Sequence, residues 1–397
     1  MRFIVPALLA TVIAAPAWSA AATSADTWPQ YRGANRDGIS TEKLTFSATP
    51  PEQVWKASLG FGFTSIAVSG GLVYAGGHKD GQDTLYCFDA KTGKSAWTFS
   101  HAAELTANMY EGGPNATPTV SGKNVYLLAK DGFTACLDAK TGKVVWQKNI
   151  AQEVGAAKPD WGFSGSPTVV GRALFLNIGS HGTAVEAATG KLVWKSGGSK
   201  AGYASVIPLP GAKTPTLLVA TENALAGVDA ASGKKLWSHA WTTMYGVNAA
   251  DPIALGNQVF ISGGYNYGGN LVDISGQPRD VWKNTAMRNH FNACVLIDGH
   301  LYGFDDDKGL KCLDWKTGET KWHKDGLGKG SLAAVNGKLV ILSERGELVI
   351  AEATPSAFTE ISRSQVLGGR CWTSPAIADG RIYVRNAKGD LVCLAVK

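Results

Sequence analysis

Seven residues of this sequence could together form a ligand site, because they combine cationic groups with aromatic rings. Guanidinium and ammonium groups bind carboxylates and phosphates, and aromatic faces attract cations and stack on rings. This combination predicts a pocket for an anionic or carbohydrate-like small molecule. The alternative is a structural role, in which the same groups bond carbonyls and carboxylates at the rim of a channel. The candidates are Trp161, Arg288, Asn289, His290, Lys329, Arg370 and Trp372.

Metal and catalytic signatures are weak by comparison. The seven histidines are scattered, with no two at the spacing of zinc ligands. Asp305, Asp306 and Asp307 resemble the start of a calcium loop, but the later glutamate of such a loop is missing. We therefore assign no catalytic residue and no metal ligand from the sequence.

The composition indicates what kind of chain must position these residues. It has 397 residues, with 48 glycines, 13 tryptophans, 45% hydrophobic residues and 18% charged residues. This is ample material for a core, and it suggests many tight turns and a recurring large aromatic residue. The net charge of +6 is mild and comes without basic runs, which argues against nucleic-acid binding. We expect a monomer.

The N-terminus predicts export. Arg2 precedes an apolar stretch that ends in small residues, as in a cleavable signal peptide over residues 1–21. No later segment approaches the roughly 20 apolar residues of a membrane span, and the first cysteine, Cys87, is too distant to carry a lipid anchor. We expect a periplasmic or secreted protein in which residues 22–51 form an extended N-terminal arm.

One short phrase recurs along the chain. CFDAKTGKSAW (87–97) returns as CLDAKTGKVVW (136–146), VEAATGKLVW (185–194), VDAASGKKLW (228–237) and CLDWKTGETKW (312–322), with a degenerate copy at 271–282. The tryptophans of these phrases, together with Trp55, follow one another at intervals of 40 to 49 residues. Each unit also contains four short β-rich pieces bounded by glycine turns. Four strands at this period are typical of a β-propeller blade.

The units predict an all-β, eight-bladed propeller of four-stranded antiparallel blades over residues 52–397. The last unit ends after its third strand, and the orphan strand 52–59 has the composition to complete it. We therefore expect this N-terminal strand to close the ring by joining the C-terminal blade. The inner strands are expected to begin at Ser65, Thr117, Ser166, Ser205, Asp251, Ala293, Ser331 and Ser374.

The repeated aspartate and tryptophan have structural roles in this interpretation. The aspartate can accept backbone N–H bonds in the hairpin that follows it, and the tryptophan can plug the gap between neighbouring sheets. Cysteines at equivalent third-strand positions lie too far apart for disulfides, so we expect them to be buried and free. The expected docking residues are Asp89, Trp97, Asp138, Trp146, Trp194, Asp229, Trp237, Trp282, Asp314 and Trp322.

The phrases FDAKTGKSAW and LDAKTGKVVW resemble the tryptophan-docking repeat of the pyrroloquinoline quinone (PQQ)-like propeller family. The segments WPQYRGANRDGIS (28–40), WGFSGSP (161–167) and RCWTSP (370–375) are similar to exported PQQ-like repeat proteins in particular. More distantly, the family includes quinoprotein dehydrogenases and the assembly factor BamB. The resemblance implies the fold across the mature chain, but it is poor support for any one activity.

The resemblance leaves three functions open. Short, uniform turns on one face of the propeller indicate a scaffold, so we expect any site on the opposite face, at the channel mouth. The favoured interpretation is a binding or scaffold module for the small molecule above, or for an envelope protein. A PQQ-dependent dehydrogenase, with PQQ and calcium, is an alternative, although the adjacent cysteine pair of the catalytic members is missing. The second alternative is a BamB-like outer-membrane assembly factor, a role that usually accompanies a lipid anchor.

Overall fold

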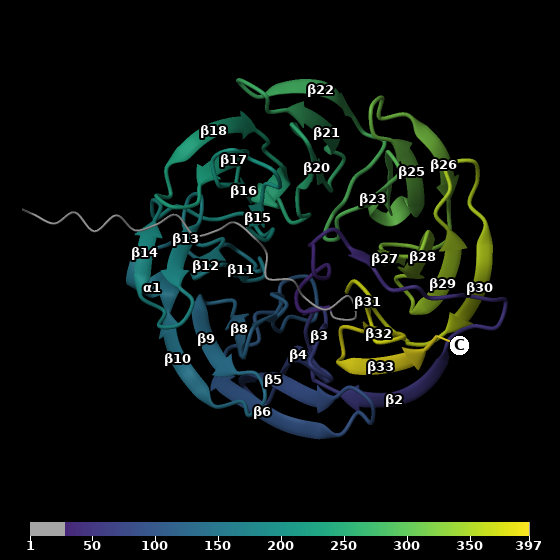
Figure 1. The fold of residues 1–397 in the computed structure, drawn as a ribbon, viewed down its shortest axis with the longest axis horizontal. Helices are drawn as coiled ribbons and strands as arrows, with labels where there is room; N and C mark the ends of the chain where they lie inside the picture. Colours follow the sequence, from purple (N-terminus) through teal and green to yellow (C-terminus); the bar gives the residue numbers. More distant parts are fainter. Residues whose placement is uncertain (1–27, 397) are drawn as a thin grey trace, which may run out of the picture.

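The computed structural model describes residues 28–396, so the predicted signal peptide lies outside the described residues. The described chain folds into eight sheets arranged as a ring, with their inner strands next to a central channel (Figure 1). This confirms the predicted all-β, eight-bladed propeller of four-stranded antiparallel blades. The blades are numbered here from 1 to 8 in chain order.

Each of the first four blades is built from four strands that follow one another in the sequence, the first being innermost. The strands of blades 1 and 2 are β3 (Ala67–Ser69), β4 (Leu72–Lys79), β5 (Gln82–Asp89), β6 (Ser95–Ala102), β7 (Thr119–Ser121), β8 (Asn124–Leu128), β9 (Phe133–Asp138) and β10 (Val144–Asn149). Those of blades 3 and 4 are β11 (Thr168–Val170), β12 (Ala173–Leu176), β13 (Thr183–Glu186), β14 (Leu192–Lys195), β15 (Ile207–Pro208), β16 (Thr216–Ala220), β17 (Ala224–Asp229) and β18 (Lys235–Ala240).

The same order continues around the ring until the last blade, which has three strands of its own. The strands of blades 5 and 6 are β19 (Ile253–Leu255), β20 (Gln258–Gly263), β21 (Gly268–Asp273), β22 (Arg279–Asn284), β23 (Val295–Ile297), β24 (His300–Phe304), β25 (Leu310–Asp314) and β26 (Thr320–Lys324). Those of blades 7 and 8 are β27 (Ser331–Val335), β28 (Lys338–Leu342), β29 (Glu347–Glu352), β30 (Glu360–Gln365), β31 (Ala376–Ala378), β32 (Arg381–Arg385) and β33 (Asp390–Ala395).

The N-terminal strand β2 (Glu52–Ser58) completes blade 8. It pairs antiparallel with β33, and Trp55 lies opposite Cys393 in the register. Because the first strand of the propeller is bonded to the last, the edge of β33 is covered and hydrogen bonds join the two ends of the ring. The predicted closure is confirmed.

Helical structure is minor. Among residues 28–396, one α-helix, α1 (Ile150–Val154), follows blade 2, and two short 3-10 helices, η1 (Met244–Gly246) and η2 (Asp306–Lys308), lie in loops. In the described part of the chain, no helix has the length and apolar character that a membrane crossing requires.

Tryptophans of the outer strands join neighbouring blades. The indole Nε1 of Trp146 in blade 2 donates to the carbonyl of Ala187 in blade 3 at 2.9 Å, and its ring packs against Gly190 of the same hairpin. An indole that fills the gap between two sheets buries a large apolar area and still satisfies its one donor. The corresponding bonds run from Trp55 to Ala90, from Trp97 to Ala139, from Trp194 to Ala230, from Trp282 to Trp315 and from Trp322 to Thr354.

An aspartate holds the receiving hairpin in blades 1, 2, 4 and 6, whereas Glu186 occupies this position in blade 3. In blade 1, Asp89 Oδ1 accepts from the backbone N–H and the hydroxyl of Thr92, at 2.8 and 2.7 Å. These bonds lower the pKa of Asp89, since they favour the ionised form. The aspartates of the other repeats make the same contacts with Thr141, Ser232 and Thr317.

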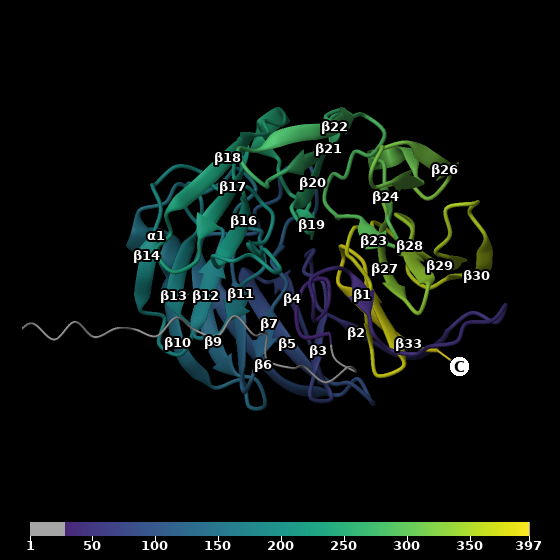
Figure 2. The ribbon, with the colours of Figure 1, turned by 45° about the horizontal axis from the view of Figure 1, so that its top comes forward.

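The described part of the N-terminal arm runs through the centre of the ring (Figures 1 and 2). Residues 30–38 form a series of turns and bends there, and the short strand β1 (Ile39–Ser40) then adds to β27 in parallel. The arm bonds six of the eight blades, so it ties together parts of the ring that do not touch one another. Its partners are Val68, Val120, Pro167, Cys294, Ala334 and Gly380, in blades 1, 2, 3, 6, 7 and 8.

Arg32 anchors this arm. It is 2% exposed, and its guanidinium donates to the carbonyls of Ala293 and Cys294 at 3.1 and 2.7 Å. It also donates to the carbonyls of Arg36 and Asp37 within the arm. These four carbonyl acceptors replace the hydrogen bonds to water that the guanidinium loses on burial.

Candidate ligand site at the channel mouth

A series of hydroxyl groups lines part of the channel, where the inner strands of neighbouring blades begin. The backbone N–H of Ser65 donates to the hydroxyl of Thr117 in the next blade, and that of Thr117 donates to Ser166, each at 2.9 Å. The N–H of Ser166 donates to Ser205 at 3.2 Å, and the N–H of Ser205 donates to Asp251 Oδ1 at 2.7 Å. Each bond joins one blade to the next at the equivalent position of the repeat. The series of polar groups along the channel therefore follows from the propeller repeat itself.

Asp251 ends this series and differs from the other members. Its Oδ2 atom is buried and has no hydrogen-bond partner among residues 28–396, and the residue is 5% exposed. Burial raises the pKa of Asp251, and the charges of Arg32 and Arg36 only partly oppose that rise. A carboxyl group with one free oxygen therefore lies among hydroxyls at the base of the channel mouth.

These residues form the floor of a cavity of about 380 Å³ at the channel mouth. The arm closes it from below, since Tyr31 lines the cavity and its hydroxyl donates to Asn292 Oδ1 at 3.5 Å. Most of the upper wall comes from the connections that lead into the inner strands, which is the face where we expected a site. The lining includes Phe63, Asn108, Tyr110, Asn115, Trp161, Tyr203, Tyr265, His290, Phe291, Lys329, Trp372 and Ser374.

Nine rings form one continuous series of contacts around the mouth, here called the aromatic collar. Successive ring centroids lie between 4.0 and 6.3 Å apart. Rings in contact at such distances stabilise one another and present their faces or edges to a ligand. In order, the collar consists of Tyr110, Phe63, Trp372, Phe291, His290, Tyr265, Tyr245, Trp161 and Tyr203.

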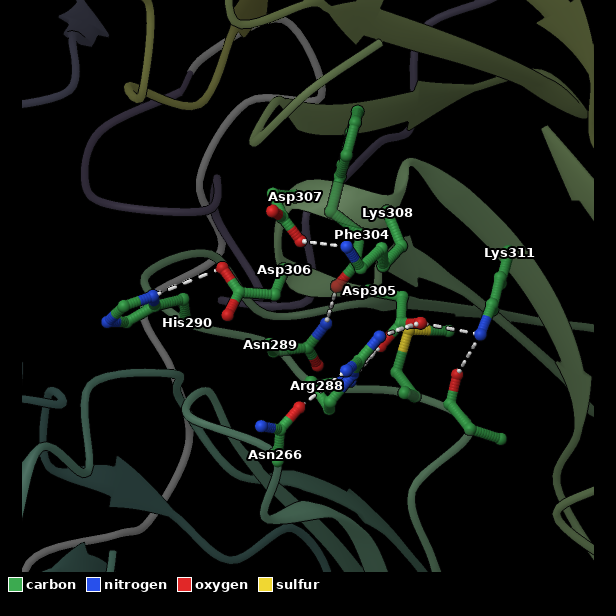
Figure 3. Close-up of polar contacts among 12 residues, drawn as sticks. Asn266, Arg288, Asn289, His290, Phe304, Asp305, Asp306, Asp307, Lys308 and Lys311 are labelled. Carbon is green, nitrogen blue, oxygen red and sulfur yellow. Dashed lines mark hydrogen bonds and ion pairs between the residues drawn. The ribbon is translucent and has the colours of Figure 1, made fainter. Parts of the chain in front are cut away.

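Two of the predicted cations, His290 and Lys329, share one carboxylate. Lys329 Nζ lies 2.9 Å from Asp306 Oδ1. His290 Nδ1 lies 3.3 Å from the same oxygen (Figure 3). Burial alone would raise the pKa of Asp306, but the hydrogen bonds from these two groups bring it well below its usual range. The ammonium group also lies 5.7 and 5.9 Å from the ring centroids of Phe291 and Trp372.

Arg288 and Asn289 form hydrogen bonds with groups of blade 6 and do not line the cavity. Arg288 Nε bonds the fully buried carboxylate of Asp305 at 2.5 Å, and Lys311 Nζ bonds the other oxygen of that carboxylate (Figure 3). Asn289 Nδ2 donates to the Phe304 carbonyl at 2.9 Å. A doubly paired carboxylate and a satisfied amide indicate structural roles for these two predicted site residues.

Arg370 lies at the rim. Its guanidinium carbon lies 4.4 Å from the Trp372 ring centroid, and its Nη1 forms an ion pair with Glu111 Oε2 at 2.7 Å. Trp372 Nε1 in turn donates to Glu344 Oε1 at 2.9 Å. Arg370 therefore helps to fix the Trp372 ring of the collar, but it does not itself line the cavity.

The structure thus brings four of the seven predicted site residues to one cavity, namely Trp161, His290, Lys329 and Trp372. The mouth differs from the predicted cationic pocket in one respect, because His290, Lys329 and Arg370 each contact a carboxylate. The sequence interpretation also missed Asp251 as a site residue. Its signal was available, since it is acidic at a position where most blades carry serine or threonine.

The eight-bladed ring, its docked tryptophans and its aromatic cavity define a β-propeller with a ligand-sized site at the channel mouth. A family model described as "Outer membrane protein assembly factor BamB" matches residues 45–153 and 106–324, which together span more than half of the chain. The chain belongs to this family of PQQ-like β-propellers.

Solved structures share the fold at low sequence identity. BamB from Moraxella catarrhalis gives a TM-score of 0.63 at 16% identity, over 87% of this chain and 100% of that chain. Quinohemoprotein alcohol dehydrogenase from Comamonas testosteroni gives 0.70 at 14% identity, over 94% and 80%. A europium-containing methanol dehydrogenase gives 0.70 at 13% identity, over 91% and 89%. At such identities the likeness shows the fold alone. No curated protein sequence matches the chain.

The donor set of the cavity does not fit a calcium-bound quinone of the PQQ type. PQQ is a planar tricarboxylate, so it needs uncompensated cations, and its calcium needs several oxygen ligands. Within residues 28–396 there is no grouping of three His, Cys, Asp or Glu side chains suited to a metal ion. Lys329 and His290 are already paired with Asp306.

Proposed function

We propose that this chain is an exported binding module that holds a neutral, carbohydrate-like molecule in the cavity at the channel mouth. The observation that carries this proposal is the aromatic collar above a floor of hydroxyls, amides and one carboxyl group. A sugar ring has an apolar C–H face that packs on an aromatic ring, and hydroxyls around its edge that need polar partners. Collar and floor supply both kinds of contact.

Charge compensation favours a neutral ligand over an anionic one. Asp306 pairs with Lys329 and His290, and Glu111 pairs with Arg370, so these three predicted site residues have little unopposed positive charge. An anionic ligand would have to replace these carboxylates and would also meet the carboxyl group of Asp251. A neutral ligand displaces no carboxylate and is not repelled by Asp251.

Export is part of the proposal and rests on the sequence of residues 1–21. A protein with such a segment is delivered outside the cytoplasm, where free saccharides and cell-envelope glycans are available ligands. N-terminal sequencing of the protein recovered from the periplasm or the medium tests this step. Recovery of an uncleaved chain in the cytoplasm would contradict it.

The test of the ligand class is calorimetric titration of the mature protein with neutral mono- and disaccharides. We expect at least one of them to bind, and Trp372→Ala and Trp161→Ala to weaken it by about tenfold or more, as for buried aromatic anchors. Tyr267→Ala is the matched control, because that tyrosine is 36% exposed and is not a member of the collar.

PQQ, with and without calcium, is titrated in the same experiment. Tighter binding of PQQ than of every saccharide would overturn the proposal in favour of a quinoprotein. Absence of saccharide binding, or unchanged binding by both tryptophan variants, would also overturn it.

A partner protein on the same face is the second candidate, and the match to the BamB family model favours it. Such a partner would cover the collar from outside. It predicts that the mature protein co-purifies with an outer-membrane assembly complex and that Tyr245→Ala, at a 65% exposed ring of the collar, weakens this association.

A further inference from the structure

The floor of the cavity contains a feature that the collar does not explain, namely the free oxygen of Asp251. We propose that Asp251 orients the ligand and selects neutral saccharides against sugar acids, by accepting a hydrogen bond from a ligand hydroxyl through Oδ2. This inference rests on the proposed function and names the polar contact that would give that site its specificity.

The first step is the geometry of the carboxyl group. Its Oδ1 accepts the backbone N–H of Ser205 at 2.7 Å, which fixes the side chain against the channel wall. Its Oδ2 has no partner in residues 28–396, although the residue is 95% buried and lines the cavity. A buried carboxylate oxygen without a donor is costly, so a donor supplied by a ligand would be strongly favoured.

The second step is that neither of the two nearby guanidinium groups bonds Asp251. Arg32 donates to the carbonyls of Ala293 and Cys294. Arg36 donates through Nη2 to Gln30 and to the carbonyl of Pro167, and its Nη1 has no hydrogen-bond partner among residues 28–396. No cationic nitrogen of the described residues forms an ion pair with Asp251 within 4.0 Å. The carboxyl group therefore keeps its capacity to accept from a ligand.

The third step concerns the neighbouring hydroxyls. Thr117 and Ser166 each accept a backbone N–H, so their own O–H protons remain to be donated. The floor then offers donors beside one strong acceptor. Adjacent hydroxyls of a sugar can both donate and accept, and they match such a floor.

The fourth step is the rejection of acids. A uronate carboxylate placed on this floor would face Asp251. When Asp251 is ionised, the two like charges repel more strongly there than in solution, because Asp251 is buried. The uronate oxygens would also leave Oδ2 without a donor. The same residue thus favours one class of saccharide and disfavours the other.

The experiment titrates the mature protein with two matched pairs, glucose with glucuronate and galactose with galacturonate. We expect the wild-type protein to bind the neutral member of at least one pair about tenfold more tightly than the acid. Asp251→Asn keeps the shape and the acceptor for Ser205 but puts a donor in place of Oδ2. We expect it to lose about tenfold or more in neutral affinity and to bind the acid about as well as the neutral sugar.

Asp251→Ser, which restores the hydroxyl found in most other blades, is the second variant, so the test does not depend on one substitution folding correctly. Asp325→Asn is the control for the change in net charge, because its side chain is 85% exposed on the outer part of blade 6. Unchanged preference in both Asp251 variants, with saccharide binding intact, would overturn this inference and leave the proposed function standing. Absence of saccharide binding by the wild-type protein would overturn the proposed function itself.

Discussion

Arg370, in the connection between blades 7 and 8, and Glu111, in the connection between blades 1 and 2, form an ion pair of 2.7 Å across 259 residues of sequence. Glu111 belongs to a long connection over residues 103–118, of which Asn108, Met109 and Tyr110 line the cavity. Further contacts hold this connection, among them one from Lys130 to the hydroxyl of Tyr110 and one from the Trp161 indole to the Asn108 carbonyl. The loop is therefore fastened at several points around the mouth.

Arg370→Ala should loosen this loop without unfolding the propeller. The pair is partly exposed, so its loss should cost about 1 kcal/mol of stability or less. Amide exchange of residues 104–113 should become faster, while exchange in the blade strands stays as it is. Arg279→Ala is the control, because Arg279 makes a pair of the same length with Asp273 in blade 5. Equal exchange of the loop in both variants would show that the Arg370 pair does not hold it.

The glycine of the docking hairpin allows a test of the blade contacts. Gly190 has a φ of +67°, and a Cβ there would lie 2.8 Å from the Trp146 ring. Gly171 in the same blade has a φ of +58° and no neighbour within 4 Å of such a Cβ. Both alanine variants bear the cost of a positive φ, about 1 to 2 kcal/mol, but only Gly190→Ala must also push the indole away.

We therefore expect Gly190→Ala to be less stable than Gly171→Ala by about 1 to 3 kcal/mol, the usual cost of overpacking. Chemical unfolding followed by tryptophan fluorescence measures the difference. Equal destabilisation in the two variants would mean that the indole of Trp146 moves at no cost and does not lock blade 2 to blade 3.

The fold was predictable because its physical causes repeat. The Asp, Thr-Gly and Trp of each unit form a hairpin and a plug, and the same spacing returns often enough to count the blades. The orphan strand carrying Trp55 revealed the closure for the same reason. The arm has no counterpart in the repeat, so no internal comparison could place Tyr31 and Arg32 inside the channel.

The site was predictable only in part. The inter-blade connections showed which side chains meet at the mouth, as with His290 and Lys329. They did not show what those side chains bond, since Asp306 comes from a hairpin loop and Glu111 from a distant connection. Charge pairing of this kind depends on the three-dimensional path of loops, and residue spacing carries no record of it.

Asp251 should make stability depend on pH in a direction opposite to that of a salt-bridged carboxylate. Burial raises its pKa, so the folded state holds its proton more tightly than the unfolded state. The cost of the ionised form should grow as the pH rises from below the unfolded value of about 3.9 through the folded value. Asp251→Asn removes this cost. We expect equal melting temperatures near pH 3 and a higher melting temperature for the variant at pH 7.

The measurement is thermal unfolding of both proteins across this pH range, taken as a difference curve. Other carboxylates, including the low-pKa Asp306, contribute equally to both proteins and cancel in the difference. A variant that is less stable than the wild type at pH 7 would show that the charge of Asp251 supports the fold, and would remove the reason to regard it as a group held ready for a ligand.

Asp306 should determine whether the mouth accepts anions. In Asp306→Asn, Lys329 keeps its position near the rings of Phe291 and Trp372 but loses its carboxylate partner at 2.9 Å. We expect this variant to bind a tricarboxylate such as citrate or PQQ about tenfold more tightly than the wild type, with an affinity that falls as salt is added. Asp307→Asn is the control, because that carboxylate is exposed and pairs with Lys308. Adding Lys329→Gln should abolish the gain. If Asp306→Asn binds anions no better than the wild type, charge compensation is not the reason for a neutral ligand.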